Sequence, residues 1–310
     1  MRSLIVLDSD ISSWYVMACD TPRQSERHTL PSGDIHTLSW GSGTKELVLL
    51  IHGALAHAEC WAMVAPFLVG QDRLIVAADL SGMGDSPWLS EYSIATHTQN
   101  IIDLCQIYQN FESVTLVGHS YGGIISSCCF EKMGYSNHVN HILIDVFLDF
   151  LSPRHHINKR SPLMAKPVRY YESEAHALAR FRLIPPQPTR HDELFNYLAK
   201  CSVVETDNGW RWKFDPKLLS LIGHHPDIDT ERLLAHMKQQ AKDVYYIYGQ
   251  HTSRSLIQSA HKLMQTLGQP THLFAVDDAY HHIMLDNPIE LTHIINQILN
   301  DCRSRHFRLD

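Results

Sequence analysis

The stretch from Ser113 to Phe130 limits the folds open to this chain more than any other part of the sequence. It starts with a β-branched and apolar run, residues 114–117, which predicts a buried strand, and it ends in an apolar segment that can form a helix. Between the two, the sequence Gly-His-Ser-Tyr-Gly-Gly puts Ser120 in a Gly-x-Ser-x-Gly pattern. This order of strand, pattern and helix predicts a sharp turn with a serine nucleophile at its tip.

Glycines on both sides of Ser120 fit such a turn. A residue at the tip has strained backbone, and glycines remove the Cβ atoms that would collide with the neighbouring strand and helix. Ser120 Oγ would then project above the end of a parallel sheet. The N–H groups that follow it would be free, at a helix N-terminus, to meet an anion.

Buried-strand runs recur before and after this turn. Continuous apolar runs indicate strands buried on both faces, as in a parallel sheet, and here they alternate with segments of helical spacing. The runs occupy residues 47–51, 74–78, 114–117, 141–144, 244–248 and 271–276, and the helical segments include residues 60–68, 96–108 and 288–299. The alternation predicts an α/β fold with a mostly parallel central sheet flanked by helices.

Residues 151–240 interrupt the alternation with many prolines, mixed charge and amphipathic pieces. Active sites of open α/β sheets gather at the strand ends, so we expect a mainly helical cap over that edge, inserted after the strand that ends near Asp145. The expected core comprises residues 1–150 and 241–310, and the alternative for the insertion is a separate domain. Residues 1–27 show no clear period and predict a loosely attached surface arm.

The charge balance excludes several classes of partner. Lys and Arg number 26 against 33 Asp and Glu, which gives a formal net charge of −7. A general electrostatic attraction to nucleic acid or an anionic membrane is therefore not expected. The N-terminal apolar run, residues 4–7, is too short for the core of a signal peptide, and no segment approaches the roughly twenty apolar residues of a membrane span.

Cysteine and histidine patterns narrow the chemistry further. The seven cysteines are odd in number and form no Cys-x-x-Cys pair, so they predict buried thiols in a reducing, cytoplasmic compartment. Three His-His doublets occur, but adjacent side chains point in different directions and no His-Glu-x-x-His is present, so no metal site is expected. No Gly-x-Gly-x-x-Gly follows the first strand, so no cofactor is expected either. The oligomeric state stays open.

A serine hydroxyl is a weak nucleophile, so Ser120 requires a base within hydrogen-bond reach and a carboxylate that orients the base. These partners should follow the serine in the chain, on loops after later strands. His281 stands just after the last predicted strand, and its neighbour His282 would point elsewhere. His281 is therefore the predicted base.

Four motifs resemble those of the α/β-hydrolase superfamily and occur in the same order. They are His-Gly-Ala at residues 52–54, Asp-Leu-Ser-Gly-Met-Gly-Asp-Ser at 79–86, the serine turn at 118–123, and His-His-Ile-Met-Leu-Asp-Asn-Pro at 281–288. The resemblance covers about residues 30–300 and implies an α/β-hydrolase fold. Counted back from Pro288, it also implies that His281 is the catalytic base, although Tyr280 stands where the family usually has glycine.

The triad acid departs from the common pattern of the superfamily. Most relatives carry it in a Gly-x-x-Asp turn, but here the sequence from Gly249 reads Gly-Gln-His-Thr-Ser. A minority of relatives place the acid one strand earlier, which implies Asp145, with Asp149 as the second choice. Both loops open on the same sheet edge, so either can reach the histidine ring. A structural role for Asp145, and use of Asp277 or Asp278 as the acid, stay open.

Two backbone N–H groups are expected to stabilise the oxyanion of the tetrahedral intermediate. One belongs to Tyr121, directly after the nucleophile, and the other to Ala54, in the loop after an earlier strand. The side chains of His52, His119 and Trp61 are expected to shape the substrate pocket, with a packing role as the alternative.

These expectations describe a serine hydrolase that cleaves carboxylic esters of small substrates through a Ser120–His281–Asp145 triad and an acyl-enzyme. A lactonase, an amidase and a carbon–carbon bond hydrolase use similar arrangements. A ligand-binding receptor with little turnover is the alternative from another class, because fold alone does not fix function. Aromatic and cationic segments of the insertion, residues 180–188 and 209–216, either pack on the core, line an acyl pocket or bind a carboxylate.

Overall fold

The computed structural model of the chain describes residues 10–133, 138–147, 167–221, 228–240 and 243–306. Its centre is an eight-stranded sheet with the strand order β1-β2-β4-β3-β5-β6-β9-β10. The strands are β1 (Gln24–His28), β2 (Ile35–Trp40), β3 (Glu46–Ile51), β4 (Arg73–Asp79), β5 (Ser113–His119), β6 (His138–Ile144), β9 (Val244–Gly249) and β10 (Leu273–Val276).

The sheet is mostly parallel, as the continuous apolar runs predict. Strands β4, β3, β5, β6, β9 and β10 run parallel to one another, whereas β2, near one edge, pairs antiparallel with both β4 and β1. Strand β5 lies between β3 and β6, with Val117 opposite Leu50 on one side and Ile142 on the other. The residue that follows β5 is therefore placed at the middle of the edge where the parallel strands end.

Successive side chains of each strand face opposite sides of the sheet, and each side is covered by helices. Val48 and Leu50 of β3 pack in one hydrophobic cluster with α1, α8 and α9, whereas Leu47, Leu49 and Ile51 pack in the other with α2, α3, α6 and α7. These helices are α1 (Ile11–Asp20), α2 (Ile94–Ile107), α3 (Tyr121–Met133), α6 (Thr230–Gln239), α7 (Arg254–Thr266), α8 (Ile283–Asp286) and α9 (Pro288–His306). None of the helices in the described ranges combines the length and the apolar character needed to cross a bilayer.

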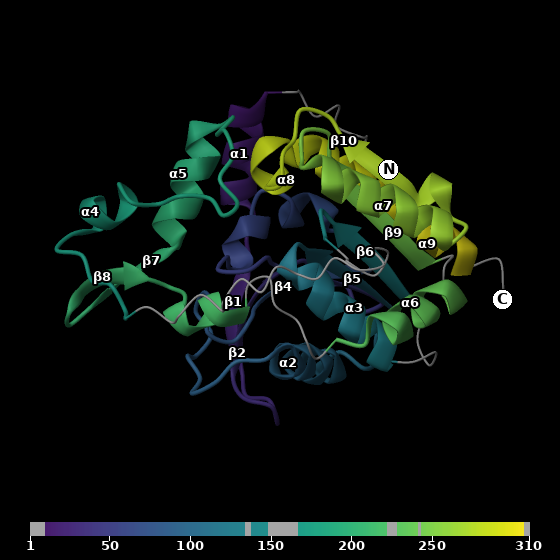
Figure 1. The fold of residues 1–310 in the computed structure, drawn as a ribbon, viewed down its shortest axis with the longest axis horizontal. Coiled ribbons are helices and arrows are strands. Elements are labelled where there is room, and N and C mark those ends of the chain that lie inside the picture. The colour runs from purple at the N-terminus through teal and green to yellow at the C-terminus, as the bar shows by residue number, and fades with distance from the viewer. Residues whose placement is uncertain (1–9, 134–137, 148–166, 222–227, 241–242, 307–310) are drawn as a thin grey trace.

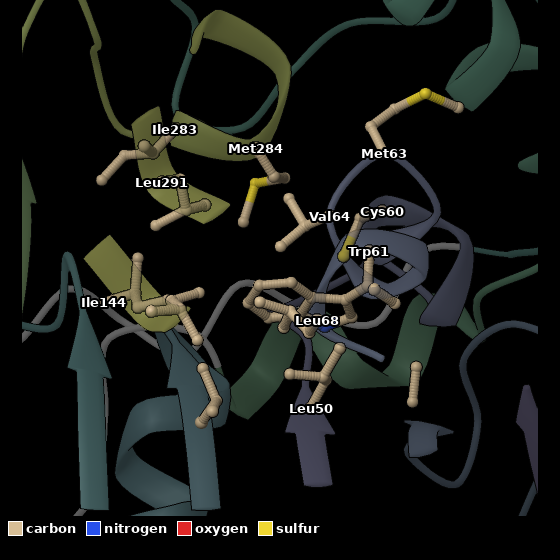
Figure 2. Packing of buried hydrophobic residues seen from close by; sticks show 14 of the residues in the cluster. Leu50, Cys60, Trp61, Met63, Val64, Leu68, Ile144, Ile283, Met284 and Leu291 are labelled. Carbon is tan, nitrogen blue, oxygen red and sulfur yellow. The ribbon is translucent and has the colours of Figure 1, made fainter. Parts of the chain in front are cut away.

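Segment 60–68 departs from its predicted single helix. It forms two short 3₁₀ helices, η1 (Ala58–Trp61) and η2 (Ala65–Leu68). Pro66 stands at the start of the second, and because proline lacks an N–H group it cannot continue a longer helix. Figure 2 shows Trp61 of this segment in the same buried cluster as Leu50 and Met284.

The prediction of a loose N-terminal arm is wrong for the described residues from Asp10 onward. Asp10 caps α1 by accepting hydrogen bonds from the N–H groups of Ser12 and Ser13. Trp14 is completely buried, stacks on Phe67 with ring centroids 3.7 Å apart, and donates from Nε1 to the Met63 carbonyl at 2.7 Å. Strand β1 then joins the sheet beside β2. One buried indole thus anchors a helix whose sequence has no clear period.

The insertion between β6 and β9 contains strands as well as helices. Its described elements before α6 are α4 (Glu174–Leu178), α5 (Asp192–Cys201), β7 (Val203–Thr206), β8 (Gly209–Trp212) and the 3₁₀ helix η4 (Pro216–Leu221). Strands β7 and β8 form an antiparallel hairpin that the expectation of a mainly helical insertion did not include. In Figure 1, α4, α5, β7 and β8 project to the left of the central sheet.

Helix α6 lies with the core, although it falls within the segment predicted as a cap. Met237 of α6 belongs to the same buried cluster as Phe130 of α3, and the His236 ring meets the Phe130 ring edge to face at 5.0 Å. Residues 148–166, which include the start of the predicted cap, lie outside the described residues. The extent of a cap therefore stays a prediction.

Candidate active site

Ser120 occupies a sharp turn between β5 and α3. Its φ angle is +52°, in the left-handed region that residues other than glycine rarely adopt. The turn is fixed by two backbone hydrogen bonds, from Ser120 N to the Ile144 carbonyl at 3.0 Å and from Gly123 N to the Ser120 carbonyl at 2.9 Å. The strain is thus maintained by the strand on one side and the helix on the other.

Close packing explains the glycines around Ser120. A Cβ atom at Gly118 would lie 2.3 Å from Ser126 Oγ and 2.5 Å from the Gly122 carbonyl oxygen. A Cβ atom at Gly122 would lie 2.3 Å from the carbonyl oxygen of Ile51 at the end of β3. All three distances are far shorter than real Cβ contacts, so the strand, turn and helix approach this closely only with glycine at these positions.

His281 lies in the loop between β10 and α8, and its Nδ1 atom is 2.7 Å from Asp145 Oδ2. An ionised carboxylate only accepts hydrogen bonds, so Nδ1 carries the proton and donates it. In the neutral ring, Nε2 is then the nitrogen that can take up a proton. The structure therefore brings the predicted base and the predicted acid together.

Asp145 is completely buried and follows β6 with a φ angle of +49°. Besides His281, its carboxylate accepts hydrogen bonds from Thr252 Oγ1 at 2.7 Å and from Gly249 N at 3.2 Å. Gly249 is the last residue of β9, and Thr252 belongs to the turn that follows, where most relatives were expected to carry the acid. In this chain the end of β9 and that turn supply hydrogen-bond donors to a carboxylate that comes from the neighbouring strand.

The other candidate acids do not meet His281 among the described residues. Asp277 and Asp278 are exposed, and Asp278 forms an ion pair with Arg190 at 3.2 Å. Asp149 lies outside the described residues. Thr252 was not singled out from the sequence. The available signal was a hydroxyl residue in the turn after β9, where most relatives would carry the acidic residue of the triad.

The loop after β3 lies directly against the serine turn. A Cβ atom on Gly53 would lie 3.0 Å from His119 Nδ1 and 3.3 Å from Ser120 Cβ. Within the described residues, no acceptor takes a hydrogen bond from Ala54 N–H, whereas the next N–H, of Leu55, donates to Met83 Sδ at 3.2 Å. Tyr121, whose N–H is the other expected oxyanion donor, is the first residue of α3.

His52 and Trp61 hold this region together from inside and do not line the cavity described below. His52 is completely buried; its Nδ1 donates to the Gly53 carbonyl at 2.7 Å and its Nε2 accepts from Leu80 N at 3.0 Å. His52 thereby connects the loop after β3 to the loop after β4. Its burial lowers the pKa of the ring. Trp61 is also completely buried, in the hydrophobic cluster. Their burial fits a packing role, the alternative left open for them.

His119 supports the loop between β10 and α8 that carries His281 and His282, here called the histidine loop. Its Nε2 donates to the His281 carbonyl at 2.9 Å, and the two ring centroids are 4.8 Å apart. Burial, and then the proximity of His281 and His282, hold the pKa of His119 well below its ordinary value. The His119 side chain is therefore neutral and can donate one hydrogen bond to the loop without adding charge beside the base.

A cavity of about 190 Å³ lies beside these residues. Ser120 and His281 are not among its lining residues, but their neighbours His119 and His282 are, together with Ala54. The opposite wall comes from the insertion, including Phe181, Leu183, Ile184, Leu198 and Phe214. The cavity is thus bounded by the loop after β3 and by the insertion.

One residue of the insertion is bonded to the histidine loop. Gln187 Nε2 donates to both carboxylate oxygens of Asp286, at 2.8 and 3.0 Å, and Gln187 Oε1 accepts from His282 N at 2.8 Å. Asp286 also accepts from Tyr280 N at 2.7 Å, and its burial raises its pKa. Gln187 and Asp286 therefore fix the backbone on both sides of His281, a role that the sequence pattern did not indicate.

Among the described residues, His36, Asp79 and Asp85 form a group whose ligand atoms all lie within 4.8 Å of one another. The Asp79 carboxylate already accepts from His36 Nδ1 at 2.7 Å, Ala58 N at 2.6 Å and Asp85 N at 2.9 Å. A carboxylate with three donors in place is used as a structural anchor for the surrounding loops.

Comparison with known proteins supports what the geometry indicates. A family model described as "Alpha/beta hydrolase family" matches residues 48–293. Methylesterase 8 of Arabidopsis thaliana is 33% identical over 90 residues, or 28% of this chain and 33% of that protein. Lipase LipV of Mycobacterium tuberculosis is 33% identical over 93 residues, or 30% of this chain and 34% of that protein. The matched segments span about a third of the length of these curated relatives.

The fold also matches solved structures over nearly its whole length. The thioesterase domain from the curacin biosynthetic pathway superposes with a TM-score of 0.69 at 22% identity, covering 89% of this chain and 99% of that domain. The matched family region contains the serine turn, Asp145 and His281, and it covers most of the sequence. The chain belongs to the α/β-hydrolase family.

Proposed function

We propose that the protein is a serine hydrolase that cleaves carboxylic esters of small substrates through an acyl-enzyme. The observation that carries this proposal is the 2.7 Å hydrogen bond between His281 Nδ1 and Asp145 Oδ2, at the sheet edge where Ser120 occupies its strained turn. The similarity to proteins named methylesterase and lipase supports an ester as the bond that is cleaved.

In the acylation step, Ser120 Oγ attacks the ester carbonyl carbon while His281 Nε2 takes up the hydroxyl proton. The carbonyl oxygen becomes an oxyanion, which accepts hydrogen bonds from the N–H groups of Ala54 and Tyr121. Each such donor is typically worth about 100-fold to 1,000-fold in turnover. The intermediate collapses when His281 returns its proton to the leaving alcohol, which leaves the acyl group on Ser120.

In the deacylation step, water attacks the acyl carbon and passes a proton to His281 Nε2. A second oxyanion forms in the same place and collapses to the carboxylic acid, while His281 protonates Ser120 Oγ. Asp145 stays ionised throughout; it holds the ring tautomer and stabilises the imidazolium that forms in each step. The donors Thr252 and Gly249 hold that carboxylate in its orientation.

We further propose that residues 151–240 act as a cap that bounds the acyl pocket. The apolar side chains of Phe181, Leu183 and Phe214 in the cavity wall support this role. Because the other wall includes Ala54, a substrate carbonyl at the loop after β3 would place its attached chain against these side chains.

The test is hydrolysis of short-chain nitrophenyl esters by the purified protein and by Ser120→Ala. The variant should lose the activity, and a fluorophosphonate should label Ser120 and no other serine when the peptides are examined by mass spectrometry. Ser90→Ala is the matched control, since Ser90 is exposed and is not one of the residues proposed for the triad or the oxyanion site. Activity that survives in Ser120→Ala would rule out the proposed nucleophile. Tight binding of small molecules without turnover of any ester, thioester, lactone or amide would favour a receptor.

A further inference from the structure

The charged residues that line the cavity are all cationic. They are Arg180, Arg182 and Lys213, and within the described part of the chain no Asp or Glu side chain contributes to the lining. The chain as a whole has more acidic than basic residues, 33 against 26. The charge of the cavity wall is therefore opposite to the charge of the protein.

The two arginines are not neutralised by acids of the described residues. The Arg182 guanidinium donates to the carbonyls of Ala179 and Phe181, which are neutral. Among the described residues, the Arg180 guanidinium forms no hydrogen bond or ion pair, and only the backbone N–H of Arg180 donates, to the Ala177 carbonyl. Lys213 differs, because its Nζ lies 2.8 Å from a carboxylate oxygen of Asp85. Two guanidinium groups thus remain available at the wall, and both side chains belong to exposed residues at its rim.

The histidines of the same wall add no charge near neutral pH. Burial lowers the pKa of His57 to about 4 and that of His282 to about 3, and it holds the pKa of His119 well below its ordinary value. The positive character of the cavity therefore comes from side chains that stay charged over the whole working range of pH.

A second hollow extends this cationic surface outward. It has a volume of about 390 Å³ and shares Gly84 and Lys213 with the first cavity. Arg27 and Arg211 also line it, and Arg211 lies over the Trp88 ring with its guanidinium carbon 4.1 Å from the ring centroid. Its one acidic lining residue among those described, Asp85, is the partner of Lys213. A negatively charged ligand would meet a favourable electrostatic potential in the second hollow and in the adjoining cavity.

We propose that the substrate is an ester that carries a carboxylate at the far end of an apolar chain, bound by Arg180 and Arg182. The apolar side chains of the wall accept the chain but cannot replace the hydration of a carboxylate, whereas a guanidinium offers paired donors that match its two oxygens. The inference rests on the proposed ester hydrolysis and names the class of substrate for it.

The test compares two series of nitrophenyl esters that differ in one group. One series consists of monoesters of dicarboxylic acids of increasing length, and the other has a primary amide in place of the free carboxylate, which keeps size and shape but removes the charge. A matched pair with the carboxylate or amide on the alcohol side covers the opposite orientation. We expect kcat/KM to be about tenfold higher for the carboxylate member at one or more lengths, and the advantage to shrink as salt is raised.

The double variant Arg180→Gln/Arg182→Gln should bring the ratio of kcat/KM between the two series close to one. Arg254→Gln is the control, because Arg254 is an exposed arginine of α7 outside the cavity wall, and it should keep the ratio. Equal kcat/KM for both series at every length, or a ratio that survives in the double variant, would overturn the inference while leaving ester hydrolysis in place.

Direct binding separates this inference from the proposed function. Dicarboxylic acids and their monoamides are titrated calorimetrically into Ser120→Ala, with and without the two arginine substitutions. Tighter binding of the diacid that is lost with the arginines supports the anionic site even if no ester is turned over. Equal binding of diacid and monoamide in that protein would overturn it.

Discussion

Thr252 Oγ1 donates a 2.7 Å hydrogen bond to Asp145 Oδ2, the same carboxylate oxygen that accepts from His281 Nδ1. The threonine stands in the turn after β9, and the aspartate follows β6, the strand beside it. The carboxylate and its supporting donor therefore come from neighbouring strand ends. A carboxylate is needed next to the histidine, but the sheet edge offers more than one strand from which it can come.

Asp145→Asn should lower kcat for ester hydrolysis by about 10⁴-fold, because an amide can present its NH₂ group to His281 Nδ1 and so favour the wrong tautomer of the ring. The side chain keeps its size, so the fold should persist, as circular dichroism can verify. Asp149→Asn serves as the comparison. If that change abolished turnover and Asp145→Asn did not, the acid would be assigned to the wrong residue.

Thr252→Val removes the hydroxyl donor while keeping the shape of the side chain. The buried carboxylate then loses one of its hydrogen bonds, which should cost about 1–3 kcal/mol in the free energy of unfolding. We also expect kcat to fall, since the Asp145 carboxylate is less firmly oriented. Denaturant unfolding and ester kinetics measure the two effects, and Thr252→Ser, which keeps the hydroxyl, should restore most of both. A valine variant with unchanged stability and kcat would show that Thr252 does not support the acid.

The central sheet could be predicted because its strands are buried on both faces. Such strands must be apolar at consecutive positions, so β3, β4, β5, β6 and β9 appear in the sequence as uninterrupted runs. The serine turn was also predictable, since the collisions that a Cβ atom would make at Gly118 and Gly122 leave glycine as the residue that fits.

The missed features depend on contacts between distant parts of the chain. Trp14 fixes α1 through its contacts with Phe67 and Met63, and no local sequence pattern predicts these contacts. Likewise, Gln187 meets Asp286 across 99 positions of sequence. A single polar side chain on a loop belongs to no periodic sequence pattern. Its hydrogen-bond partner therefore becomes known only when the fold places the two loops together.

Gln187→Ala should reduce kcat by about 10-fold to 100-fold with a smaller change in KM, because it frees the backbone on both sides of His281 and a small displacement of a catalytic group is costly. Gln187→Glu should move the pH optimum of kcat downward. It places a second carboxylate against Asp286, and the pair regains a hydrogen bond only when one of the two is protonated. The matched control is Gln109→Ala, an exposed glutamine outside the site. Retention of kcat within about twofold in both Gln187 variants would contradict a positioning role.

His141 should make the protein less stable in mild acid. It is completely buried on β6, and burial lowers its pKa to about 3. In the unfolded chain its pKa is about 6.5, so between these two values the unfolded state binds a proton that the folded state does not. The free energy of unfolding therefore falls as pH decreases from about 6.5, and the loss continues toward pH 3.

His141→Leu should flatten this part of the pH dependence. The hydroxyl of Ser126 lies 2.8 Å from His141 Nε2 and donates to the Gly123 carbonyl, so it keeps an acceptor when the ring is removed. Urea unfolding at a series of pH values from about 4.5 to 7.5 measures the slope for both proteins. The exposed His293 supplies the control, because its replacement by leucine removes a histidine that stays close to solvent in the folded state. The slope should change in the His141 variant and stay the same in the His293 variant. An equal change in both variants would show that the burial of His141 is not its cause.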